Sequence, residues 1–121
     1  MGAPVTGPRF LAESELQLTE RAAAAAGYEV RRFRARDLVV VHVREPGGPW
    51  RYFAPLDSNA EAFALQVRMC MSVDVGTDRH ATAKTPIAPQ MREPLPVGHW
   101  SEAAAAARLA IVKAVALVKG E

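Results

Sequence analysis

Apolar and polar residues alternate along this chain with two periods, one typical of helices and one typical of strands. The first helical stretch opens at Ser14, which forms an S-x-x-Q capping box with Gln17. It is rich in alanine and runs to Gly27, a residue that suits the left-handed position just beyond a helix end. The sequence therefore predicts a first helix between Ser14 and Gly27.

Three strands are predicted after this helix. Residues 28–34 have strand character, and residues 38–43 are apolar on both faces, which is typical of a central strand. Residues 50–53 form a third, short strand. Between the last two strands, residues 45–49 contain two prolines and two glycines, so we expect a turn or short loop there.

A second helix is predicted to begin at Ser58, with Glu61 completing another capping box. Apolar residues recur in it at helical spacing and should form its buried stripe: Ala60, Phe63, Ala64, Val67 and Met71. Phe63 is the largest of them, so we expect it to pack this helix on the sheet.

A second hairpin follows the helix. Residues 71–75 alternate between apolar and polar, a Gly-Thr-Asp turn comes next, and residues 80–84 form the returning strand. Residues 85–99 contain four prolines and no regular period, which predicts an irregular loop.

The last helix is predicted to be capped by Ser101 and to run over residues 101–119. Its main apolar stripe consists of Ala104, Ala107, Ile111, Val115 and Val118. Leu109 and Val112 lie on the opposite side, and a helix that is apolar on more than one face needs more than one cover. Either the proline-rich loop or a second copy of the chain could supply that cover. We expect self-association through Leu109 and Val112.

Together these elements predict an α+β fold. It consists of a mostly antiparallel sheet of about five strands, with three helices packed on it in the order αβββαββα. We expect residues 1–12 to form a flexible N-terminal arm and residues 13–121 to form a single domain.

Arginine dominates the positive charge of the chain, with twelve arginines against three lysines and a net charge of only +2. Four arginines fall within six residues, and a fifth follows in the third strand: Arg31, Arg32, Arg34, Arg36 and Arg51. One interpretation is a strip that binds a phosphate or an acidic partner. The other is a GC-rich genome, which raises arginine and alanine together, and the chain also holds two runs of five alanines.

Residues that could perform chemistry are few. His42, His80 and His99 lack metal-ligand spacing, and His42 lies in an apolar strand where a structural role is expected. Cys70 is the only cysteine, which excludes a disulfide within the chain, and its apolar setting predicts a buried, inert thiol. We therefore expect a non-enzymatic protein without a cofactor or a metal. No apolar run is long enough to span a membrane, so we expect a cytoplasmic protein that stays inside the cell that makes it.

Two blocks of the chain resemble the phage αβα-sandwich domain family, which consists of small proteins of tailed phages and prophages. The first is Phe53-Ala54-Pro55-Leu56-Asp57-Ser58-Asn59-Ala60-Glu61-Ala62-Phe63-Ala64-Leu65, and the second is Ala107-Arg108-Leu109-Ala110-Ile111-Val112-Lys113-Ala114. Ala60 stands where glycine is frequent in the family, and the loop over residues 85–99 has more prolines than usual. The resemblance implies a phage or prophage origin and brings no catalytic residues.

These observations favour a phage accessory protein that acts by binding a host protein, for instance as an anti-CRISPR-like inhibitor of a defence system. A second hypothesis is a nucleic-acid-binding accessory factor that uses the arginine strip. A third is a small enzyme whose residues converge only in space. Composition does not separate the first two hypotheses, but the salt dependence of binding does.

Overall fold

The computed structural model describes residues 10–118. They form three helices and six strands, with a short 3₁₀ turn (η1, Thr77–Arg79) before β5. The elements are α1 (Glu13–Ala25), β1 (Glu29–Ala35), β2 (Leu38–Arg44), β3 (Arg51–Tyr52), α2 (Asn59–Arg68), β4 (Ser72–Val75), β5 (His80–Lys84), β6 (Met91–Pro94) and α3 (Trp100–Ala116).

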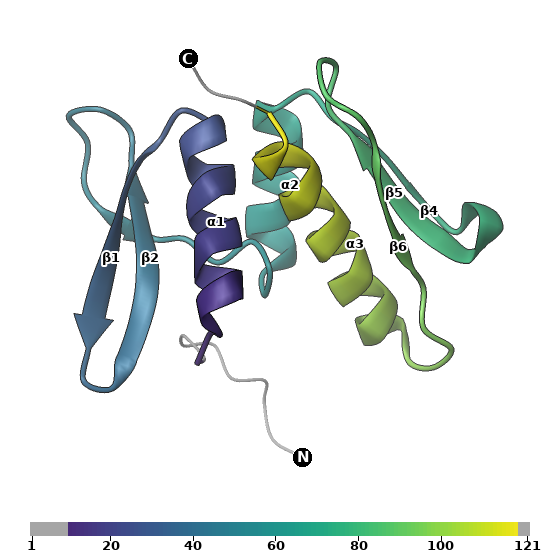
Figure 1. Ribbon diagram of the computed structural model, residues 1–121, viewed down its shortest axis with the longest axis horizontal. Helices are drawn as coiled ribbons and strands as arrows, with labels where there is room; N and C mark the ends of the chain where they lie inside the picture. Colours follow the sequence, from purple (N-terminus) through teal and green to yellow (C-terminus); the bar gives the residue numbers. More distant parts are fainter. Residues whose placement is uncertain (1–9, 119–121) are drawn as a thin grey trace.

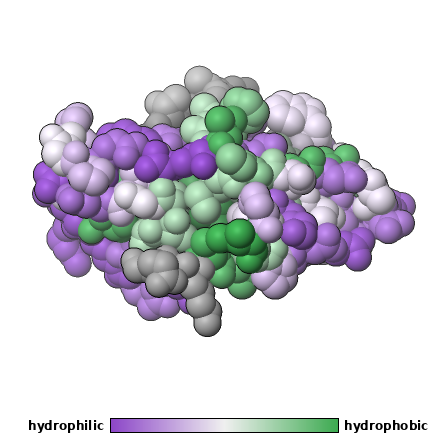
Figure 2. All heavy atoms as spheres, turned by 90° about the horizontal axis from the view of Figure 1, so that it is seen from above, coloured by the Kyte–Doolittle hydropathy of each residue, from purple (hydrophilic) through white to green (hydrophobic). Residues whose placement is uncertain are grey.

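The strands form two antiparallel sheets with the orders β1-β2-β3 and β4-β5-β6, and all three helices lie between the sheets (Figure 1). The predicted α+β class is confirmed, whereas the single sheet of about five strands is wrong. The first sheet packs on α1, and α3 packs against α1 on one side and against β5 and β6 on the other. Seen from above, hydrophobic residues gather across the middle of the molecule and hydrophilic residues lie towards its two ends (Figure 2).

The strand β6 was not predicted, because it lies within the proline-rich segment over residues 85–99. Met91 pairs with Ala83 of β5 and packs against the core, and Pro94 ends the strand, where a missing amide donor is tolerated.

The prediction that residues 38–43 form a central strand is confirmed. In β2, Val41 and Val43 are fully buried, and β1 and β3 flank this strand on either side.

The helix ends follow local hydrogen bonding. Ser58 caps α2 as predicted, since its hydroxyl accepts a hydrogen bond from the Glu61 amide at 3.2 Å. Gly27 has a φ of 93°, which confirms its left-handed position after α1. The other two caps are corrections: α1 begins one residue before Ser14, and His99 rather than Ser101 caps α3 by accepting the Ser101 amide at 3.1 Å.

The buried face of α2 also differs from the prediction. Ala62 and Leu65 are buried, whereas the side chain of Phe63 is 63% exposed and Val67 is also exposed. Ala62 and Leu65 belong to the hydrophobic core and the helix packs against α3, but apolar residues occur on both rows. Periodicity alone therefore did not determine which row faces inwards.

The last helix finds its second cover within the same chain. Val112 is fully buried, as are Ala110, Ala114 and Val115, because α3 lies between α1 and the second sheet. Leu109 is half-buried. Val112 offers no exposed surface, so the expected self-association through Leu109 and Val112 loses its structural basis.

The N-terminal segment enters the fold earlier than predicted. Leu11 is buried and belongs to the hydrophobic core, although it falls within the segment predicted to be a flexible arm. Residues 1–9 of that predicted arm lie outside the described residues.

Candidate partner-binding surface

The predicted arginine strip does not form one surface. Successive side chains of a strand point to opposite faces, so Arg31 lies on the outer face of the first sheet, and Arg32 and Arg34 lie on the face towards α1. Arg36 occupies the turn after β1 with a φ of 57°. Proximity in sequence suggested a strip, but the period of the strand divides it.

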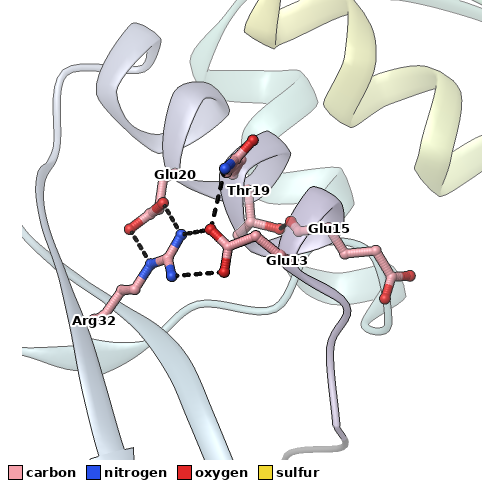
Figure 3. A network of polar contacts seen from close by, with 6 residues as sticks. Glu13, Glu15, Thr19, Glu20 and Arg32 are labelled. Carbon is pink, nitrogen blue, oxygen red and sulfur yellow. Dashed lines mark hydrogen bonds and ion pairs between the residues drawn. The ribbon is translucent and has the colours of Figure 1, made fainter.

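Arg32 is held by two carboxylates of α1 (Figure 3). Its guanidinium lies 2.7 Å from a Glu13 oxygen and 2.9 Å from a Glu20 oxygen. The hydrogen bond from Arg32 lowers the pKa of Glu13, and the two carboxylates raise the pKa of Arg32. This arginine joins β1 to α1, and its charge is already balanced.

Arg51 is paired as well. Its side chain lies on the inner face of the first sheet, where Nη1 contacts Glu61 of α2 at 3.0 Å and the guanidinium lies 5.5 Å from the ring centre of Tyr28. Of the five predicted residues, only Arg31 faces outwards from the first sheet.

Arg31 belongs to a cluster that sequence reasoning did not assemble. Its guanidinium lies over the ring of Trp50, 4.3 Å from the ring centre, and the guanidinium of Arg44 lies over the same ring at 4.6 Å. Arg44 also contacts Glu29 at 2.6 Å. Cations over an indole ring attract its π electrons, so the three side chains hold one another in place.

An aromatic pair continues the same face. The rings of Phe33 and His42 stack at 4.7 Å with an angle of 12° between their planes. Phe33 remains 42% exposed, and its cross-strand partner Val40 is only 3% exposed. We call Arg31, Phe33, His42, Arg44 and Trp50 the outer-face cluster. Its members come from both strands of one hairpin and from the residue before β3, so only the register reveals it.

His42 has an unusual environment within this cluster. Its Nδ1 atom is buried and has no hydrogen-bond partner among the described residues. Burial and the nearby charge of Arg31 lower the pKa of His42, because both disfavour the imidazolium form. The outer-face cluster is therefore partly shielded from water although no described element covers it.

Acidification should destabilise the fold through His42. Its folded-state pKa lies below its ordinary value of 6.5, so the unfolded chain takes up the proton first and the free energy of unfolding falls as the pH drops below 6.5. Urea titrations at about pH 7.5 and about pH 5 should show a smaller loss for His42→Gln than for wild type. His80 and His99 are present in both proteins, and an equal loss would contradict this role of His42.

The outer face of the second sheet is polar instead. It forms an open hollow of about 450 Å³, lined by residues that include Ser72, Thr82, Lys84 and Arg92. At one end Asp74 accepts a hydrogen bond from the Thr77 hydroxyl at 2.8 Å, so this carboxylate serves the turn. Within residues 10–118, no group of three or more histidine, cysteine, aspartate or glutamate side chains is placed to hold a metal ion.

Cys70 is exposed rather than buried, which corrects the expected inert core thiol. It follows α2 with a φ of 55°, in the turn where the chain leaves the helix. The next residue, Met71, is buried in its place.

Comparison with known proteins gives no match to a family model, a curated protein or a solved structure. The resemblance to phage αβα-sandwich proteins therefore stays a prediction. None of the helices in the described part of the chain is long and apolar enough to cross a membrane.

Proposed function

We propose that this protein acts without catalysis by binding a partner protein through the outer-face cluster. The observation that carries the proposal is the assembly of Trp50, two arginines and a half-exposed phenylalanine on a sheet face that packs on no described helix. Tryptophan and arginine are the residue types most enriched among the dominant contacts of protein interfaces. The helices cover the opposite face, so the core does not account for these side chains.

The charges favour a protein partner over a nucleic acid. Binding to a phosphate backbone needs several cations that are free to replace counterions. Arg32 and Arg51 are already paired with glutamates, and so is Arg44 of the outer-face cluster. The indole of Trp50 already contacts two guanidinium groups, which leaves less of its surface for stacking on a base.

The resemblance to phage proteins directs the proposal to a host protein, with a component of a bacterial defence system as an example. This part of the proposal rests on the resemblance in the two sequence blocks. The alternative is a nucleic-acid-binding phage factor. It would have to use Arg31, Arg34 and Arg36, which form no ion pair within residues 10–118.

A capture experiment with matched tryptophan variants tests the function. Tagged wild type, Trp50→Ala and Trp100→Ala are used as bait in nuclease-treated bacterial lysate. Trp100 is 69% exposed at the start of α3, outside the outer-face cluster, so it controls for the loss of a surface tryptophan. We expect wild type and Trp100→Ala to retain the same protein and Trp50→Ala to lose it.

Purified partner and bait then give the affinity directly. Loss of Trp50 should weaken binding by at least about thirtyfold, which corresponds to the roughly 2 kcal/mol of a dominant interface contact. Equal retention by all three baits would show that the outer-face cluster is not the binding surface. Tight, salt-sensitive binding to oligonucleotides without a retained protein would favour the nucleic-acid alternative.

A further inference from the structure

One edge of β1 pairs with no other strand among residues 10–118, and this edge is long. Sheet order places β1 at the border of the first sheet, and its seven residues pair with β2 without interruption from Glu29 to Ala35. The other border strands are shorter: β3 has two residues, and β4 and β6 have four each. Short length and proline commonly protect sheet edges from pairing with another strand. Neither applies to β1, which has seven residues and no proline.

A hollow lies beside this edge, between β1 and α1. It measures about 430 Å³ and is lined by Gln17, Glu20, Arg21, Ala24 and Val30. The side chains of a strand added along β1 would alternate between this hollow and the outer face next to Phe33. An apolar side chain entering the hollow would contact Ala24 and Val30.

The charge of β1 selects among strands that could pair with it. Arg31, Arg34 and Arg36 form no ion pair with another described residue. If two copies paired edge to edge, the arginines of both β1 strands would lie side by side, and like charges across a sheet destabilise it. An acidic strand paired with β1 would instead be attracted by the same arginines, because its charges are opposite to theirs.

We propose that the partner donates an extended, acidic segment that adds to the first sheet as a fourth strand along β1. This inference rests on the proposed function and specifies its binding mode. Backbone hydrogen bonds to β1 would supply affinity, the arginines beside the edge would favour acidic side chains, and the hollow would accept apolar side chains. The added strand would border the outer-face cluster, since Phe33 and Arg31 belong to both surfaces.

A synthetic peptide tests the mode without knowledge of the partner. The probe is a fluorescein-labelled peptide of alternating glutamate and valine, equal in length to the seven residues of β1. One control peptide replaces glutamate by lysine. A second control peptide carries N-methyl groups on alternate amides, those that would face β1. These groups remove the hydrogen-bond donors of the peptide on that side but keep its charge. Binding is followed by fluorescence anisotropy at low and at physiological salt.

We expect the acidic peptide to bind and both control peptides to fail. The double variant Arg34→Glu with Arg36→Glu should weaken binding by at least about tenfold, because it reverses two charges beside the edge. The double variant Arg79→Glu with Arg92→Glu makes the same charge change at the second sheet and should bind as wild type does. Amide hydrogen exchange of residues 29–35 should slow when the acidic peptide is added, since their exposed N–H groups become bonded.

Equal binding of the N-methylated peptide would overturn strand addition, because charge alone would then explain the association. Strand addition would also be overturned if neither the acidic peptide nor its N-methylated control bound. A dimer formed through β1, detected by light scattering, would overturn it as well. If the peptide fails while Trp50-dependent capture of a protein persists, the binding mode is wrong and the proposed function stands. If capture fails instead, the proposed function is wrong whatever the peptide does.

Discussion

Replacing Phe53 by alanine should lower the free energy of unfolding by about 3–5 kcal/mol, the usual cost of removing a buried phenylalanine ring. Its side chain is 2% exposed and lies in the core, with its ring centre 5.7 Å from that of Tyr28. A domain of this size has a total stability of about 5–15 kcal/mol, so the variant would lose a large part of it.

Phe63 provides the matched control, because it is the same residue type ten positions further along the chain. Its ring is mostly exposed on α2, so Phe63→Ala should change the free energy of unfolding by less than about 0.5 kcal/mol. Urea titrations followed by circular dichroism measure both variants. If Phe63→Ala costs as much as Phe53→Ala, the orientation of α2 described above is wrong.

Val112→Asp should abolish cooperative folding at neutral pH. The side chain is fully buried in the hydrophobic core, so the new carboxylate would lose its hydration among apolar side chains. Leaving an unpaired charge in a protein interior costs at least about 3–5 kcal/mol. If Val112 instead lay in an interface between two copies, Val112→Asp would give a folded monomer. An aspartate exposed at such an interface would separate the copies without unfolding them.

Val67→Asp controls for this prediction, since it places the same substitution in an exposed position of α2. We expect it to cost less than about 1 kcal/mol, which includes an unfavourable carboxylate near the end of a helix. Size-exclusion chromatography and thermal melts compare the two variants. A folded Val112→Asp protein with the melting temperature of Val67→Asp would contradict the burial of Val112.

The sequence predicted the elements better than their arrangement. Strand periods, the Ser58 cap and Gly27 identified five strands and three helices, because these signals depend on neighbouring residues. The division into two sheets depends on which strands pair, and that depends on contacts between distant segments. The strand β6 was not predicted because its residues lie in a proline-rich segment with little local preference for a strand. Its pairing with β5 outweighs that local preference.

Helix orientation failed for a related reason. Both rows of α2 contain apolar residues, and the packing of the helix on the rest of the fold, α3 included, determines that Leu65 is buried and Phe63 is exposed. Likewise, the apolar character around Val112 was read correctly as a need for cover. Part of that cover is β6, which lies in the proline-rich segment, as one of the two alternatives expected, and the rest comes from α1 and β5. Periodicity shows that a face is apolar and does not show what lies on it.

The candidate surface shows the same limit. Arg31 was identified from composition, whereas Phe33, His42 and Arg44 were not, since their significance comes from the register of β1 with β2. Arg32 was included because it lies close in sequence to three other arginines, and Arg51 because it follows in the third strand. Their ion pairs with Glu13 of α1 and Glu61 of α2 depend on how those helices pack, which the local sequence does not show.

The placement of the helices between two sheets gives some of the alanines a steric explanation. Ala22 and Ala23 of α1 and Ala110 and Ala114 of α3 have no exposed surface, and the two helices pack against each other. A methyl group at these positions limits the thickness of the middle layer, and a larger side chain would push the sheets apart at a cost of about 1–3 kcal/mol. Ala24, although it belongs to the same run of five, is exposed. Genome composition can therefore account for Ala24, but geometry restricts the four buried alanines to the smallest side chains.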